Sequence, residues 1–209
     1  MSPQPAARSP QIVDPADVLF AIADELRGGG TLISARVVEP DAEPALGMLI
    51  AAGPRCRNAP GEYARVLESV REGYLLHYGA PRILDGLDRD LALLAGDYLY
   101  ALGLERLTAL ADLPAVRELS DLISLCAQLH ADDGAGQDGT AALWLASAIA
   151  IGAGGGEAHA SAKAGIRARA PGAAEALRRQ AHSRAGAAGL ADRYRRTSEA
   201  IEFGAQHSS

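Results

Sequence analysis

Apolar residues recur at intervals of three and four along most of this chain, a spacing typical of helices with one buried face. The pattern is clearest over residues 61–78, 87–102 and 116–129. Residues 140–151 are almost uniformly apolar and lie between glycines. Their apolar stretch is shorter than the roughly 20 residues that span a bilayer, so we expect a buried core helix and no membrane span. The pattern predicts an all-α protein.

Local signals set the ends of several predicted elements. Asp14 before Pro15 is typical of a helix start, and the glycine run from Gly28 ends that first helix. A second short helix is predicted within residues 41–53. The β-branched stretch 31–39 has no strand partner nearby, and it is predicted as helix or extended connection.

The second half of the chain predicts more helices. The short turn at "ADLP", residues 111–114, predicts that the two long helices on either side of it are antiparallel neighbours. Pro171 separates a predicted helix over about residues 157–169 from one over about 172–203. Gly96 lies inside a long helix, where glycine is unfavourable, and this suggests a close approach by a neighbouring helix.

Composition supports one helical domain. Hydrophobic residues make up 48% of the chain but aromatic residues only 4%, so small and aliphatic side chains must form the core. At 209 residues, we expect a single domain over residues 14–203, with disordered tails at 1–13 and 204–209. The first tail has no apolar segment of the kind that a secretory signal needs.

Charge and cysteine content narrow the class of protein further. From Glu157 onward there are nine basic and five acidic residues, against eleven and twenty-one before it, so an acidic body carries a basic end. Cys56 and Cys126 are too few for a disulfide framework, and we expect a cytoplasmic location. The five histidines have no metal-ligand spacing. We expect no nucleic-acid partner.

One segment resembles a known family. Leu94 to Leu99 reads "LAGDYL", with Gly96 and Asp97 at its centre, and a helix that begins near Pro114 follows. After a loop, Thr140-Ala141 opens an Ala-rich helix that ends in glycines. From Leu91 to these glycines, the order and spacing resemble the polyprenyl diphosphate synthases, an all-α family. The resemblance implies a helical bundle of the isoprenoid-synthase type, in truncated form.

The resemblance implies a chemistry whose residues the sequence lacks. Family members extend an allylic diphosphate with the help of Mg²⁺ held by two Asp-Asp-x-x-Asp motifs, because carboxylates must bridge the metal to diphosphate oxygens. Where the first motif would lie, His77 is followed by Tyr78 and Gly79. The second motif is absent as well, and Gly139 stands where the family has a lysine before Thr140.

Four residues remain as weak site candidates. Asp85 and Asp88 could share a helix face as a degenerate metal site, or belong to a solvated helix start. Arg55 and Arg57 resemble the family's Gly-Lys-Arg-x-Arg stretch, or form an ordinary surface loop. The adjacent pair Asp132-Asp133 is predicted to lie in a loop.

These observations favour a non-catalytic protein on the prenyl-synthase scaffold. It would act as a partner or structural subunit of a larger assembly, for example as the small subunit of a heteromeric synthase, with a protein partner or with copies of itself. The alternatives are a divergent prenyltransferase that needs Mg²⁺, and an unrelated helical binding module. No cofactor is expected under the first hypothesis, and the sequence does not identify a small-molecule ligand.

Overall fold

The computed structural model describes residues 13–131 and 136–206, with side chains from 13 to 131 and from 139 to 201. These residues form helices, turns and loops, together with one isolated β-bridge between Val37 and Leu84. The predicted all-α class is therefore confirmed for the described part of the chain. The elements are η1 (Pro15–Asp17), α1 (Val18–Gly28), η2 (Ser34–Arg36), α2 (Ala45–Ala51), α3 (Pro60–Tyr78), α4 (Arg89–Ala109), α5 (Leu113–Ala131), α6 (Gly136–Ala153), α7 (Gly156–Arg167), α8 (Ala173–Ala187) and α9 (Ala191–Gln206).

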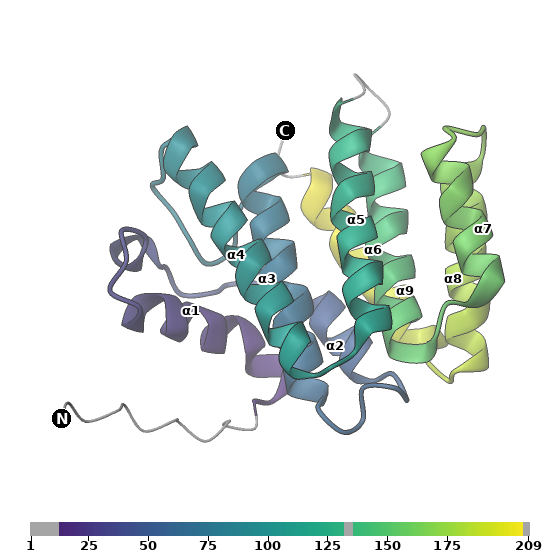
Figure 1. The fold of residues 1–209 in the computed structure, drawn as a ribbon, viewed down its shortest axis with the longest axis horizontal. Helices are drawn as coiled ribbons and strands as arrows, with labels where there is room; N and C mark the ends of the chain where they lie inside the picture. Colours follow the sequence, from purple (N-terminus) through teal and green to yellow (C-terminus); the bar gives the residue numbers. More distant parts are fainter. Residues whose placement is uncertain (1–12, 132–135, 207–209) are drawn as a thin grey trace.

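The long helices pack as successive pairs. Helix α3 packs on α4, α5 on α6 and α7 on α8, and Figure 1 shows these pairs arranged side by side. Helix α6 contacts α2, α5, α7, α8 and α9, and from residue 139 to 153 every residue except the half-buried Ala141 is buried. The predicted core helix is thus confirmed. Contacts between α4 and α5 are few, because each packs mainly on its other neighbour.

Buried side chains form two hydrophobic clusters. The larger one surrounds α6 and includes Trp144, and the smaller one joins α1 to α4. Helix α3 contributes Leu67 to the larger cluster and Ala64 to the smaller one, so it is buried on more than one face. This helix also carries two fully buried carboxylates, Glu68 and Glu72. It connects the two parts of the core.

Several predicted helix boundaries agree with the structure. The Asp14 side chain accepts a hydrogen bond of 2.9 Å from the Ala16 backbone N–H at the start of η1, and α1 ends at Gly28. The expected close approach at Gly96 is also present. A methyl group placed there would lie 2.6 Å from His77 Nε2 and 3.0 Å from the Gly73 carbonyl oxygen, both on α3.

The helix predicted over residues 172–203 is wrong, because two helices occupy that range. Gly189 adopts a φ of +74°, which favours glycine, and ends α8. The Leu190 N–H then donates a 2.8 Å bond to the Ala185 carbonyl, and α9 starts at Ala191.

Other segments differ in part from the prediction. The ambiguous stretch 31–39 contains the short η2 and the bridge residue Val37. Of the predicted tails, 1–12 and 207–209 lie outside the described residues, as does the pair Asp132-Asp133, whereas 204–206 belong to α9. None of the described helices is both long and apolar enough to cross a membrane.

Candidate functional site

A cavity of about 490 Å³ lies between α2, α3 and the ends of α5, α6 and α9. Its polar lining includes Arg71, Tyr74 and Tyr78 from α3, His130 from the last turn of α5, and Thr140 from α6. We name it the Arg71 cavity. Its apolar wall includes Leu46, Leu75 and Ile201, and Asp41 and Glu43 stand exposed in its lining.

Aromatic rings and imidazoles make up one side of the Arg71 cavity. The Tyr74 hydroxyl lies 2.8 Å from His130 Nε2, and the Tyr78 ring stacks on His130 at 4.2 Å between centroids. Burial lowers the pKa of His130 and raises the pKa of Tyr74 to about 12, so both are neutral near pH 7. His130 is therefore a half-buried, hydrogen-bonded residue.

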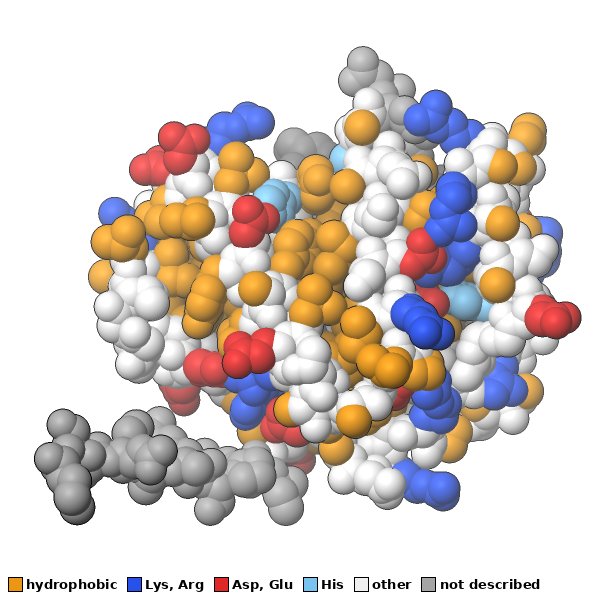
Figure 2. Space-filling model, viewed as in Figure 1, with side chains coloured by type: hydrophobic (Ala, Val, Ile, Leu, Met, Phe, Trp, Pro, Cys, Tyr) orange, Lys and Arg blue, Asp and Glu red, His pale blue; other side chains and the backbone are white. Residues whose placement is uncertain are grey.

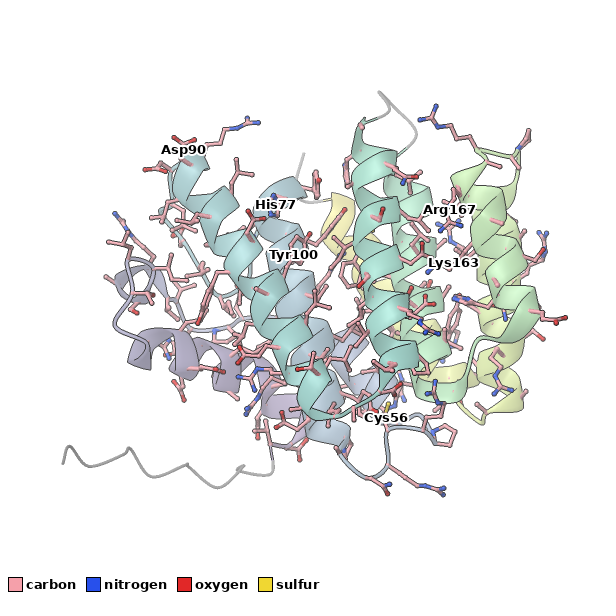
Figure 3. The ribbon with its side chains drawn as sticks, in the orientation of Figure 1. Cys56, His77, Asp90, Tyr100, Lys163 and Arg167 are labelled. Atoms are coloured by element: carbon pink, nitrogen blue, oxygen red, sulfur yellow. The ribbon has the colours of Figure 1, made fainter. Side chains whose placement is uncertain are left out.

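The same aromatic cluster continues away from the cavity. The His77 ring stacks on Tyr100 with an angle of 7° between the planes, and it contacts Tyr78 in a tilted arrangement. Figure 3 labels His77 and Tyr100, which lie next to each other where α3 meets α4. His77 Nε2 is also 3.1 Å from a carboxylate oxygen of Asp97 on α4.

Arg71 is held against the rings without a carboxylate partner. Its guanidinium carbon lies 4.9 Å from the ring centroids of both Tyr74 and Trp144. Burial and the nearby charge of Arg82 lower the pKa of Arg71. Among the described residues, no hydrogen-bond acceptor or carboxylate lies within bonding distance of its N–H groups.

The guanidinium of Arg82, by contrast, is bonded to two carboxylates. Its guanidinium bonds Glu72 at 2.5 Å and Glu68 at 2.6 Å, and its backbone N–H donates to Glu72 at 2.9 Å. Glu68 also accepts a 2.6 Å bond from the Gly47 N–H at α2. The charge of Arg82 is therefore neutralised by buried carboxylates, and its N–H donors are less available to a ligand than those of Arg71.

The structure does not place Asp85 and Asp88 on one helix face. Asp88 caps α4 by accepting a 2.8 Å bond from the Leu91 N–H. Asp85 lies in the preceding loop, where its side chain accepts a 2.7 Å bond from the Gly86 N–H. Of the two alternatives, the structure therefore agrees with an exposed helix start and not with a shared helix face, because α4 begins only at Arg89.

The remaining sequence candidates lie on different elements. Arg55 and Arg57 are exposed in the loop between α2 and α3, where Arg55 lies 3.4 Å from Asp112. Gly96 and Asp97 of α4 both lie close to the His77 side chain of α3. Thr140 is buried and lines the Arg71 cavity.

A second polar cluster joins α5 to α7. Glu118 accepts hydrogen bonds from Ser147 at 2.6 Å and Lys163 at 2.8 Å, and it lies 3.0 Å from His159 Nε2. Lys163, the only lysine of the chain, is 3% exposed and also contacts Asp121. Figure 3 shows Lys163 and Arg167 on the side of α7 that faces α5.

Electrostatics in this cluster favour a charged Glu118. Burial alone would raise its pKa, but the hydrogen bond from His159 and the charge of Lys163 outweigh burial and lower the pKa to about 2. The ionised carboxylate is therefore part of the packing between α5 and α7.

Large apolar side chains are exposed together on α4. Leu94 is 62% and Tyr98 43% exposed, and Leu32 of the loop after α1 is 81% exposed. With Ile33 and Leu91 they line a surface hollow of about 750 Å³. We name Leu32, Leu94 and Tyr98 the α4 patch. Figure 2 shows hydrophobic side chains gathered over α4, whereas basic side chains are more frequent toward α7.

The residues that organise these sites have little local signal in the sequence. Arg71 lies between two residues of a predicted apolar face, Val70 and Tyr74, and its position there was the only signal that it is held among aromatic rings. Glu118 and Lys163 are far apart in sequence, and nothing local indicates their contact.

The residues at the Arg71 cavity do not fit a magnesium site of the kind that the resemblance implies. Mg²⁺ prefers carboxylate oxygens, but Tyr78 and Gly79 line the cavity where the first aspartate motif would lie. Among the described residues, no group of three or more His, Cys, Asp or Glu could hold a metal ion.

Comparisons with protein-family models, curated proteins and solved structures found no match to this chain.

Proposed function

We propose that this chain is a non-catalytic helical subunit, on a scaffold like that of the polyprenyl diphosphate synthases, which binds a protein partner through the α4 patch. The observation that carries the proposal is the exposure of Leu32, Leu94 and Tyr98 around one hollow. Large apolar side chains that are exposed together around one hollow, rather than singly, are typical of interaction sites.

The geometry of the α4 patch suits a helical partner. Leu94 and Tyr98 are four residues apart on α4, so their side chains lie one above the other on the same face. Leu32 reaches the same hollow from the loop after α1. A partner helix with residues of similar spacing would bury all three side chains.

Charge around the patch indicates the polar part of the partner. Asp97 lies in the lining of the hollow with 71% of its side chain exposed, and Asp90 is exposed one turn before Leu94. Figure 3 labels Asp90 at the start of α4. A partner with Arg or Lys flanking its apolar face would complement these carboxylates.

Glutamate substitution in the α4 patch tests the proposed interface. Leu94→Glu should abolish association with the partner, because a charge would replace the apolar centre of the contact. Leu113→Glu is the matched control, since Leu113 is 64% exposed at the start of α5, beyond the far end of α4. Both variants should keep the helical circular dichroism of the unmodified chain.

Two measurements follow for these variants. Light scattering reports self-association, and affinity purification from the native organism with quantitative mass spectrometry reports other partners. The proposal requires an associated protein that Leu113→Glu retains and Leu94→Glu loses. Equal behaviour of the two variants, or a monomer without any associated protein, would refute it.

The non-catalytic part of the proposal has a separate test. A departing diphosphate needs metal ions and cationic groups to stabilise its charge. Because Asp88 caps a helix and Asp85 binds its own loop, the purified chain should form no product from farnesyl diphosphate, isopentenyl diphosphate and Mg²⁺. Product that disappears in the Asp85→Ala, Asp88→Ala double variant would make the divergent prenyltransferase the better hypothesis.

A further inference from the structure

We propose that the Arg71 cavity binds a small organic anion with a single carboxylate and an apolar body, and that Arg71 holds the carboxylate. This inference rests on the cavity alone and does not depend on the α4 patch.

The side chain of Arg71 is placed to bind a carboxylate. A guanidinium group presents five N–H donors in its plane, and both of its faces can stack on aromatic rings. The rings of Tyr74 and Trp144 take up the stacking contacts of Arg71. Its N–H donors have no acceptor among the described residues, and Arg71 lines the cavity. A carboxylate that enters the cavity could accept two parallel hydrogen bonds from this group.

The charges around the Arg71 cavity favour a ligand with one negative charge. The guanidinium of Arg82 bonds both Glu68 and Glu72, whereas among the described residues no carboxylate bonds Arg71, so the positive charge of Arg71 remains available to a ligand. Asp41 and Glu43 are exposed in the cavity lining. One negative charge on a ligand can be met by Arg71, but a polyanion such as diphosphate would be repelled by the acidic residues.

One wall of the Arg71 cavity is apolar. Leu46, Leu75 and Ile201 line the cavity, and Tyr78, stacked on His130, is 41% exposed at its edge. The volume of about 490 Å³ is within the range of about 300 to 1,000 Å³ that is typical of small-molecule sites. An aliphatic or aromatic body attached to the carboxylate would bury this wall.

The chain contains its own reporter for this site. Trp144 is the only tryptophan, it is 1% exposed, and its ring lies 4.9 Å from the guanidinium carbon of Arg71. A carboxylate bound to Arg71 changes the field at the indole ring, so Trp144 fluorescence should change on binding.

The experiment titrates the full chain with octanoate and, separately, with inorganic diphosphate. The buffer contains no carboxylate or phosphate, and Trp144 fluorescence and calorimetry are both recorded. Octanoate should bind saturably with a Kd of about 1 mM or below, and diphosphate should show no saturable binding. Loss of charge-assisted hydrogen bonds in Arg71→Gln should weaken octanoate binding about 10- to 100-fold.

Matched variants separate this site from other apolar surfaces. Arg57→Gln removes an exposed loop arginine and should leave octanoate binding unchanged. Leu94→Glu should also leave it unchanged, because that residue belongs to the α4 patch. If Arg71→Gln loses the helical circular dichroism, Tyr78→Ala takes its place, because that ring is partly exposed, and it should weaken binding about 10-fold through lost apolar contact.

Three results would overturn the inference. One is the absence of saturable octanoate binding by both methods. Another is an octanoate affinity that folded Arg71→Gln, or otherwise Tyr78→Ala, leaves unchanged. The third is binding of diphosphate as tight as that of octanoate, which would contradict the charge argument.

Discussion

At Gly96, helix α4 approaches α3 so closely that position 96 has no room for a side chain. A Cβ at this position would lie 2.6 Å from the His77 ring and 3.0 Å from a backbone oxygen of Gly73. Gly96→Leu should therefore lower the free energy of unfolding by about 1 to 3 kcal/mol through overpacking. Urea denaturation followed by circular dichroism measures this change.

Gly186 provides the control for Gly96→Leu. It is exposed inside α8, and no neighbouring atom lies within 4 Å of a Cβ added there. Gly186→Leu should stabilise the chain by up to about 1 kcal/mol, because leucine is a better helix former than glycine. Equal unfolding free energies for the two leucine variants would contradict the close approach of α3 and α4.

Glu118 should make stability depend on pH. Its folded pKa of about 2 lies below the ordinary value of 4.5, so its ionised form stabilises the fold above pH 4.5. This contribution is lost as the pH falls from 4.5 toward 2, because protonation then occurs in both the folded and the unfolded state. Glu118→Gln should lower the unfolding free energy at pH 7 by about 1 to 3 kcal/mol.

Unfolding measured from pH 7 downward tests this assignment. The difference between Glu118→Gln and the unmodified chain should be largest above pH 4.5 and should shrink toward pH 2. Glu157→Gln, at an exposed position in the first turn of α7, should remain close to the unmodified chain throughout. A constant difference for Glu118→Gln would assign the pH dependence to other groups.

At the scale of elements, the break between α8 and α9 depends on the backbone of Gly189. Its φ of +74° places it in the left-handed region, which side chains with a Cβ disfavour by about 1 to 2 kcal/mol. Gly189→Ala should lower the melting temperature accordingly, whereas Gly186→Ala should raise it. No change for Gly189→Ala would mean that the break does not need this conformation.

The sequence predicts elements better than it predicts their contacts. Residues 61–78 and 116–129 form helices as expected, because apolar spacing is a local property of the chain. The break at Gly189 was missed, since residues that favour helices, mainly alanine before the glycine and arginine after it, suggest one continuous helix. It is the backbone conformation that ends α8, and composition does not specify it.

The candidate sites were predicted less well than the helices. The sequence left a shared helix face and a solvated helix start open for Asp85 and Asp88, and the structure shows the second, because Asp88 is a helix cap and Asp85 precedes it. The Arg71 cavity combines groups from α2, α3, α5, α6 and α9, and apolar periodicity does not show which of these ends meet. In the sequence, the only sign of this arrangement is that Arg71 lies one or two turns from the aromatic residues of α3.

At the scale of the whole molecule, α3 holds the two hydrophobic clusters together with buried charge as well as apolar packing. Glu68 and Glu72 are fully buried on α3, and both bind Arg82 from the loop that leads to α4. Glu68 also receives the Gly47 N–H of α2, which belongs to the other side of the core. The charged network therefore crosses the junction between the clusters.

Substitution of Arg82 should destabilise the entire domain. Arg82→Met leaves two buried carboxylates without their cation, so it should lower the free energy of unfolding by about 3 to 5 kcal/mol. Arg89→Met, at an exposed position of α4, is the control and should change it by less than about 0.5 kcal/mol. Because both hydrophobic clusters pack on α3, the loss should appear as one lower transition for the domain.

A double variant decides whether unpaired charge causes the loss. In Arg82→Met, Glu72→Met, one buried carboxylate disappears with the arginine, and Glu68 keeps its bond from Gly47. The double variant should therefore be more stable than Arg82→Met alone by about 1 kcal/mol or more, although it carries more substitutions. A double variant that is no more stable than Arg82→Met, measured by urea unfolding of these two variants and the unmodified chain, would instead mean that Arg82 acts through its packing rather than through its charge.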